Sequence, residues 1–239
     1  MDKWTRLDDR MLERRFLTEK NPALVNIERQ SLSAAEEQGT WIVRQYCSLV
    51  RMIIEYLGLG MSLIPIHRVQ TELARNIGEE QGSRTGGVPH RELLAKILRD
   101  ELNMECFSPW SQATLRFHLA LLGQFQTQAK NPVHIAGMIY ALEASACPEL
   151  LVVARIINSF AGYQVVNLDT VQDFNRSREI KTLEDFIAVH VIDFELGHKL
   201  GLCQTLDRFA STDWEAFELG FEFVLDTMAE WWEALSNGG

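Results

Sequence analysis

The chain of 239 residues contains little proline and glycine, with six prolines and fifteen glycines. Proteins built from strands need such residues at their many tight turns. We find no segment in which apolar and polar residues alternate as in a half-buried strand, and no repeat with a period of 20–50 residues. The sequence therefore predicts an all-α protein.

Cysteine is also scarce, and its positions form no motif. The four cysteines are scattered at Cys47, Cys106, Cys147 and Cys203, without a CxxC pair. The first residues of the chain are followed by no apolar stretch typical of a secretory leader. We therefore expect four reduced thiols, which mostly fill the core of a cytoplasmic protein.

Positive charge and long apolar runs are likewise missing. The formal net charge of −10 argues against nucleic acid as a partner. No segment approaches the roughly 18 uninterrupted apolar residues of a membrane span, so we expect no membrane partner. The hydrophobic content of 46% and charged content of 23% are ordinary for globular proteins. We expect one domain over residues 1–239, with residues 1–30 forming peripheral helices.

Start and stop signals predict about eight helices after this N-terminal part. Ser33-Ala-Ala-Glu36 fits a capping box and Gly58 a helix end. Pro65 is tolerable in the first turn of the next helix, whereas Pro148 should kink or divide a later one. The expected helices cover residues 31–57, 61–81, 89–102, 108–129, 131–148, 149–160, 182–201 and 211–235.

The expected helix over residues 182–201 carries the most informative pattern. Its apolar residues occur almost all the way round, which indicates burial. It also contains His190, Asp193, Glu195 and His198, and polar side chains in a buried helix need partners. On a regular helix His190 and His198 lie about 80° apart, on one broad face. A metal ion held between helices would explain this pattern.

Acids and imidazoles also occur in other apolar helices. Glu80 and His90 bracket a glycine-rich loop, and Glu55 and Glu143 interrupt apolar helices. Sites rich in oxygen ligands with some imidazole suit iron or manganese. Helical bundles build di-iron carboxylate sites from side chains on facing helices. The spacing therefore favours a metal centre shared by several helices.

Each of these residues also has a simpler interpretation. Glu55 is typical of a side chain that reaches solvent from a helix, and Glu79 and Glu80 at a helix end are ordinarily solvated. His190 and His198 could be hydrogen-bonded core histidines. The ExxH motif that ferritin-like bundles use in pairs occurs once in a suitable helix, at Glu195-Leu-Gly-His198.

Three stretches together resemble the haem-oxygenase-like di-metal oxidases. They are residues 76–93, residues 139–143 and residues 186–198. This family includes the chlamydial protein associating with death domains (CADD), and its relatives include pyrroloquinoline-quinone synthase and the thiaminase-II proteins. The resemblance implies a seven-helix bundle with two irons in its core. In such enzymes the reduced metal pair activates O2, which oxidises a small organic molecule.

Residue by residue, the resemblance also implies a ligand set. The positions that match metal ligands are Glu80, His90, Glu143, His190 and His198. Glu55 falls near an additional carboxylate that some members use, and Glu79 is a further candidate.

The chain departs from the family pattern at one position, because Phe194 stands where the acid between the two histidines is expected. His190 and His198 are one residue further apart than in the pattern. Either a helix bulge presents Glu195 or Asp193 to the metal, or the site binds one metal, or it binds none. We keep both acids as candidates.

The implied function is a non-haem iron oxidase or oxygenase, which uses O2 on a small organic substrate, with two iron ions expected and manganese as an alternative. Haem is not expected, because the family's haem-binding members need a proximal histidine on the first helix and residues 1–66 contain none. A metal-free enzyme or ligand-binding protein, acting through Glu143 and His90, is the main alternative. Another alternative is an interaction module that binds a partner through its acidic surface or its aromatic C-terminal helix. We also expect the protein to form a homodimer.

Overall fold

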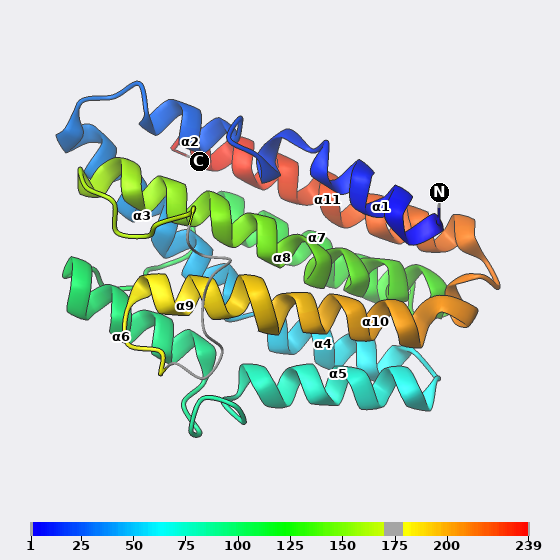
Figure 1. Cartoon of the computed structure of the whole chain (residues 1–239). Helices are drawn as coiled ribbons and strands as arrows, with labels where there is room; N and C mark the ends of the chain where they lie inside the picture. The colour runs from blue at the N-terminus through cyan, green and yellow to red at the C-terminus, as the bar shows by residue number, and fades with distance from the viewer. Residues whose placement is uncertain (1, 170–178, 239) are drawn as a thin grey trace.

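The computed structural model describes residues 2–169 and 179–238, and every regular element within these ranges is a helix. The prediction of an all-α bundle is therefore confirmed (Figure 1). The elements in chain order are α1 (Lys3–Leu12), η1 (Arg15–Leu17), α2 (Pro22–Ile27), α3 (Leu32–Val50), α4 (Ile53–Leu63), α5 (His67–Glu80), α6 (His90–Leu102), α7 (Gln112–Thr127), α8 (Pro132–Ala161), α9 (Leu183–Val189), η3 (His190–Phe194), α10 (Glu195–Ala210) and α11 (Trp214–Ser236).

Helix α8 occupies the middle of the bundle. It packs against α11, α10, α3 and α4 (Figure 1). Most of its 30 residues are apolar and buried. One cluster of buried apolar side chains extends from Leu7 on α1 to Leu235 on α11. The N-terminal helices contribute to this cluster through residues such as Leu24 and Ile27, so they cover the core from outside while their apolar faces belong to it.

Helices α8 and α11 pack closely against each other in this core. The contact is made by two glycines: a Cβ atom on Gly137 would collide with the carbonyl oxygen of Phe217, and one on Gly220 with that of His134. Because backbone atoms cannot move aside as a flexible side chain can, both positions exclude any larger residue at the present helix separation. The two glycines therefore set the distance between the two largest helices.

Replacing Gly220 with alanine should destabilise the protein by about 1–3 kcal/mol or more, because α11 must move away from α8. The matched control is Gly123→Ala on α7, where nothing lies within 4 Å of the added methyl group. Alanine favours a helix over glycine by up to about 1 kcal/mol, so this control should be neutral or stabilising. Urea unfolding of both variants checks the difference, and equal stabilities would contradict the proposed close contact.

Several helix boundaries differ from those that the sequence predicts. Pro148 does not divide α8, which continues to Ala161 because helices packed on its sides hold it in place. Pro65 lies outside a helix, and the preceding Ile64 is extended, as the steric demand of a following proline favours. Gly201 does not end its helix; it lies where α10 packs closely on the carboxylate of Glu72 from α5.

Two helical segments are long and apolar enough to cross a membrane by length and composition alone. They are Leu32–Leu63 and Pro132–Ala161, with 39% and 78% of the most apolar window buried inside the protein. Core helices of globular proteins meet the same criteria, and both segments belong to this bundle. They are therefore weak evidence of a membrane span.

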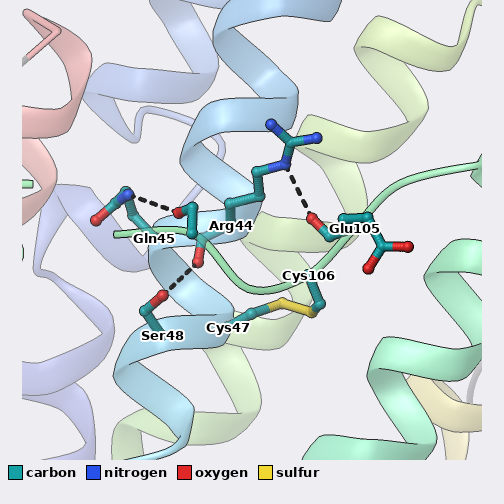
Figure 2. Close-up of a disulfide and its surroundings, with 7 residues drawn as sticks. Arg44, Gln45, Cys47, Ser48, Glu105 and Cys106 are labelled. Atoms are coloured by element: carbon teal, nitrogen blue, oxygen red, sulfur yellow. Dashed lines mark hydrogen bonds between the residues drawn. A yellow bond between two sulfur atoms is a disulfide. The ribbon is translucent and has the colours of Figure 1, made fainter. Parts of the chain in front are cut away.

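The prediction of four reduced cysteines is wrong for one pair. Cys47 on α3 and Cys106 in the loop before α7 form a disulfide, with a Cα–Cα distance of 6.0 Å, whereas Cys147 and Cys203 are free (Figure 2). The loop folds back onto α3, where the Arg44 side chain donates a hydrogen bond to the carbonyl oxygen of Glu105 (Figure 2). A separation of 59 residues conceals this contact in the sequence. The cysteines therefore no longer support the prediction of a reducing compartment.

Reduction of this disulfide should lower the free energy of unfolding by about 2–4 kcal/mol, because the unfolded chain regains the freedom of a long loop. Cys106→Ser should be less stable by a similar amount and should no longer respond to a dithiol. Cys203→Ser, which leaves the bond intact, serves as control. Urea unfolding with and without reductant measures the effect. If the reductant left the free energy of unfolding of the unmodified chain unchanged, the stabilising role of the disulfide would be refuted.

Candidate metal centre

Seven buried acids and imidazoles gather where the end of α5, the start of α6, the middle of α8 and the η3–α10 segment meet. Each is 8% exposed or less. We call this set the acid–imidazole cluster: Glu79, Glu80, His90, Glu143, His190, Glu195 and His198. The structure thus brings together the sequence candidates from separate helices.

The bulge considered for the 182–201 segment is present. Residues His190–Phe194 form a π-helical turn between α9 and α10, which accommodates the extra residue between the two histidines. The thiol of Cys147 on α8 lies 3.8 Å from the carbonyl oxygen of Val191 in this turn. After the turn, Glu195 lies beside His198 in the core, so of the two candidate acids Glu195 is the one that belongs to the cluster.

His198 lies between carboxylates on both sides of its ring. Its Nδ1 is 3.0 Å from Glu143 Oε2 and 3.8 Å from Glu195 Oε2, while its Nε2 is 3.3 Å from Glu79 Oε2. Burial lowers the pKa of His198, but these carboxylates outweigh burial and raise it to about 11. Burial raises the pKa of Glu79, but His198 and Arg75 lower it to about 2. Glu79 is thus an ionised carboxylate that fixes the orientation of the His198 ring.

The other two imidazoles of the cluster face each other. His190 Nδ1–H donates to the carbonyl oxygen of Phe186 at 2.7 Å, which leaves Nε2 as an acceptor 3.1 Å from His90 Nδ1. His90 Nδ1 is also 3.4 Å from Glu80 Oε1. Burial and the neighbouring His90 lower the pKa of His190, so its ring is neutral. Phe194, at the family's acid position, stacks on His90 with ring centroids 4.8 Å apart.

The cluster combines four carboxyl groups with three imidazoles, of which the His190 ring is neutral. One ligand atom each of Glu80, Glu195 and His198 lie within 4.8 Å of one another. Burial first, and then the charges of Glu80, Glu143 and Glu79, raise the pKa of Glu195 well above its usual value, although His198 opposes this. A cation held among these oxygens would offset their repulsion.

Two atoms of the cluster are buried without a hydrogen-bond partner in the part of the chain that the structure describes. They are Glu143 Oε1 and His90 Nε2. Such groups are rare in folded proteins, and a bound ion is one of the few explanations for them. Carboxylate oxygens combined with imidazole nitrogens suit iron or manganese. The residues present therefore fit a metal centre of this kind.

Two candidates lie outside the cluster. Glu55 is exposed at the protein surface, in a depression shared with Gln81 and Arg91, because this side of α4 faces away from the core. Asp193 points from the π-helical turn to Arg84, with which it forms an ion pair. The structure therefore does not bring these two acids to the proposed metal, whereas the ligand roles of the cluster residues remain predictions.

A cavity of about 80 Å³ adjoins the cluster. Glu80, His90, Glu143, His190 and Glu195 line it on one side. Apolar side chains from α3, α4, α6, α8 and α11 line most of the rest, among them Val50, Ile53, Leu94, Leu150 and Met228. A small molecule in this cavity would lie directly against the cluster.

The cavity also contains an acid that the sequence analysis missed. Glu149 is buried in its wall, and Trp232 Nε1–H donates to Glu149 Oε1 at 2.9 Å. Burial raises the pKa of Glu149, the hydrogen bond from Trp232 opposes this rise, and the net pKa is about 7. Directly after Pro148, Glu149 resembles an ordinary acid in the first turn of a new helix. Only the continuity of α8 places it inside the bundle.

Glu149 should make stability depend on pH. The pKa of Glu149 is 4.5 in the unfolded chain and about 7 in the folded chain. Between these two pH values the unfolded chain has lost a proton that the folded chain keeps. The free energy of unfolding therefore decreases as the pH rises through this interval. The loss amounts to roughly 3 kcal/mol across the interval. Glu149→Gln, which is neutral at every pH, should show a smaller decrease between about pH 4.5 and 8. Parallel urea titrations of both proteins would reject this expectation if the two slopes coincided.

Comparison with known proteins places the chain among helical proteins of the same architecture. The sequence profile of a family described as a domain of unknown function with a solved structure (DUF3865) matches residues 12–238. No curated protein matches the chain.

Two crystal structures of a CADD-like protein of unknown function from Nostoc punctiforme PCC 73102 are similar to this chain. The structure at 2.00 Å resolution has a TM-score of 0.81 and 22% sequence identity, over 99% of this chain and 98% of that one. The structure at 1.35 Å resolution has a TM-score of 0.78 and 21% identity, over 99% and 95% of the two chains. At these identities the likeness shows a shared fold.

Proposed function

We propose that this chain, which belongs to the DUF3865 family, binds iron in the acid–imidazole cluster and catalyses the O2-dependent oxidation of a small organic molecule. The observation that carries the proposal is a group of buried carboxylates and imidazoles in which Glu143 Oε1 and His90 Nε2 have no partner among the described residues. The CADD-like neighbours and the resemblance to haem-oxygenase-like oxidases support it.

The proposed ligands are the cluster residues that face the cavity or each other. They are Glu80, His90, Glu143, His190, Glu195 and His198. This set of three carboxylates and three histidines suits two iron ions, with manganese as an alternative. We assign no haem.

Neighbouring groups orient two of the histidine ligands. The carbonyl oxygen of Phe186 accepts the Nδ1 proton of His190, so the Nε2 lone pair is free for a metal. Glu79 accepts the Nε2 proton of His198, so Nδ1 faces Glu143 and Glu195. Arg75 in turn holds Glu79 at 2.5 Å. Such outer contacts fix the tautomer and the direction of each ring.

Iron bound by these residues would supply the electrons needed to activate O2. The side chains of the protein exclude water and hold the substrate. The apolar cavity wall excludes bulk water from the reacting side of the cluster, and a substrate lying in the cavity is held next to the ligands.

Reconstitution with ferrous iron without oxygen should give about two iron ions for each chain, measured by elemental analysis after desalting. Glu143→Gln and His198→Ala should lose most of this iron, because each removes a buried ligand. Glu79→Gln should retain iron with an affinity about 10–100-fold lower, as expected for a residue that orients a ligand.

The exposed residues Glu55 and His67 provide matched controls, since Glu55→Gln and His67→Ala remove the same groups from the surface. Both should bind iron like the unmodified chain. Circular dichroism of every variant distinguishes loss of metal from loss of fold. Only trace iron in the unmodified chain, or activity towards a substrate that persists in chelator, would favour a metal-free protein instead.

A further inference from the structure

The cavity beside the cluster has a second polar position, which the proposed metal centre does not use. Glu149 follows Glu143 on the same helix by six residues, so the two positions are separated by about 9 Å along the helix axis. Both side chains line the cavity, and Ala146 lies between them in its wall. Glu149 is therefore placed to bind one part of a molecule whose other part lies at the cluster.

The contacts of Glu149 leave part of its carboxyl group for a ligand. Trp232 Nε1–H donates to Oε1 and fixes the side chain. The same side chain is 4% exposed and lines the cavity. Tyr46, another lining residue, lies close enough for the charge of Glu149 to raise its pKa further after burial. A hydrogen-bond donor on a ligand can therefore reach the carboxyl group at a position where bulk water has little access.

The charge of the cavity wall selects between ligand classes. Four carboxyl groups line the cavity, from Glu80, Glu143, Glu149 and Glu195, and no lysine or arginine does so among the residues that the structure describes. An anionic ligand away from the metal would meet groups of its own charge. An ammonium group would meet an acceptor and oppositely charged neighbours, and charge-assisted hydrogen bonds are about twice as strong as neutral ones.

The remaining wall sets the character and size of the rest of the ligand. It is aliphatic along Leu49, Val50, Ile53, Leu142 and Leu150. The volume of about 80 Å³ is smaller than the roughly 150 Å³ of an engineered cavity that takes benzene. The cavity therefore suits a short aliphatic chain of a few carbon atoms.

We propose that Glu149 binds the ammonium group of a small aliphatic amine and so directs its carbon chain towards the acid–imidazole cluster. This inference rests on the proposed function in treating the amine as the substrate to be oxidised. In this arrangement Glu149 determines specificity, while Trp232 positions it.

Three probes of equal chain length test the inference: n-butylamine, n-butanol and butyrate. Binding to the full chain is measured by calorimetry at about pH 8, above the pKa of about 7 of Glu149, and after treatment with a chelator, so that butyrate cannot bind through a metal. We expect n-butylamine to bind at least about tenfold more tightly than n-butanol, and butyrate to bind most weakly. This comparison uses the unmodified chain, so it does not depend on whether a variant folds.

Glu149→Gln keeps the shape of the side chain and removes its charge. It should reduce the preference for the amine over the alcohol to less than about twofold, whereas Glu55→Gln on the surface should leave it unchanged. The indole N–H resonance of Trp232, assigned with Trp232→Phe, should shift when n-butylamine is added to the unmodified chain. A purely structural Glu149 would not produce this ligand-dependent shift.

The inference is overturned if n-butanol binds as tightly as n-butylamine, or if Glu149→Gln retains the preference. Iron content, measured separately on the same preparations, distinguishes this failure from failure of the proposed function. A chain that binds iron without preferring the amine contradicts the role of Glu149 alone. A chain that prefers the amine but never binds iron contradicts the oxidase, and with it the amine's role as substrate.

Discussion

The contact between His198 and Glu143 is the interaction on which the rest of the site depends. It joins α10 to α8 across the middle of the bundle, at 3.0 Å and out of reach of solvent. Buried charges are tolerated only when partners compensate them, and breaking one such pair exposes the remaining charge to an apolar interior. Here Glu79, itself held by Arg75, completes the pairing of the His198 ring. Several acids can therefore remain in a core that is otherwise apolar.

The π-helical turn allows both histidines of this segment to face the cluster. His190 faces His90 and His198 faces Glu143, although the two histidines are one residue further apart than in the haem-oxygenase-like oxidases that the chain resembles. The turn accommodates this residue, while Phe194 packs against His90 and Asp193 turns to Arg84. π-helical turns often occur at functional sites because they redirect side chains in this way.

The disulfide and the cavity are connected through α3. Cys47 is adjacent in sequence to Tyr46, which lines the cavity, and the bond to Cys106 fixes the loop that follows α6 against this helix (Figure 2). Gln45 binds the same loop through Ser108 and Pro109. One wall of the cavity is thus stabilised by the buried disulfide and by the loop that it fixes.

Local patterns along the chain were enough to predict the helical class and most of the buried acids and histidines. Helix periodicity and burial are local properties, and a polar residue such as Glu143 or His198 is conspicuous within an apolar helix. At Phe194 the sequence left three alternatives, which were a helix bulge that presents Glu195 or Asp193, a site with one metal, or a site with none. Tertiary structure brought Glu195 rather than Asp193 into the cluster, left Glu55 at the surface, paired Cys47 with Cys106 and carried α8 through Pro148 to bring Glu149 to the cavity. Each of these depends on contacts between segments far apart in the chain, which local pattern does not encode.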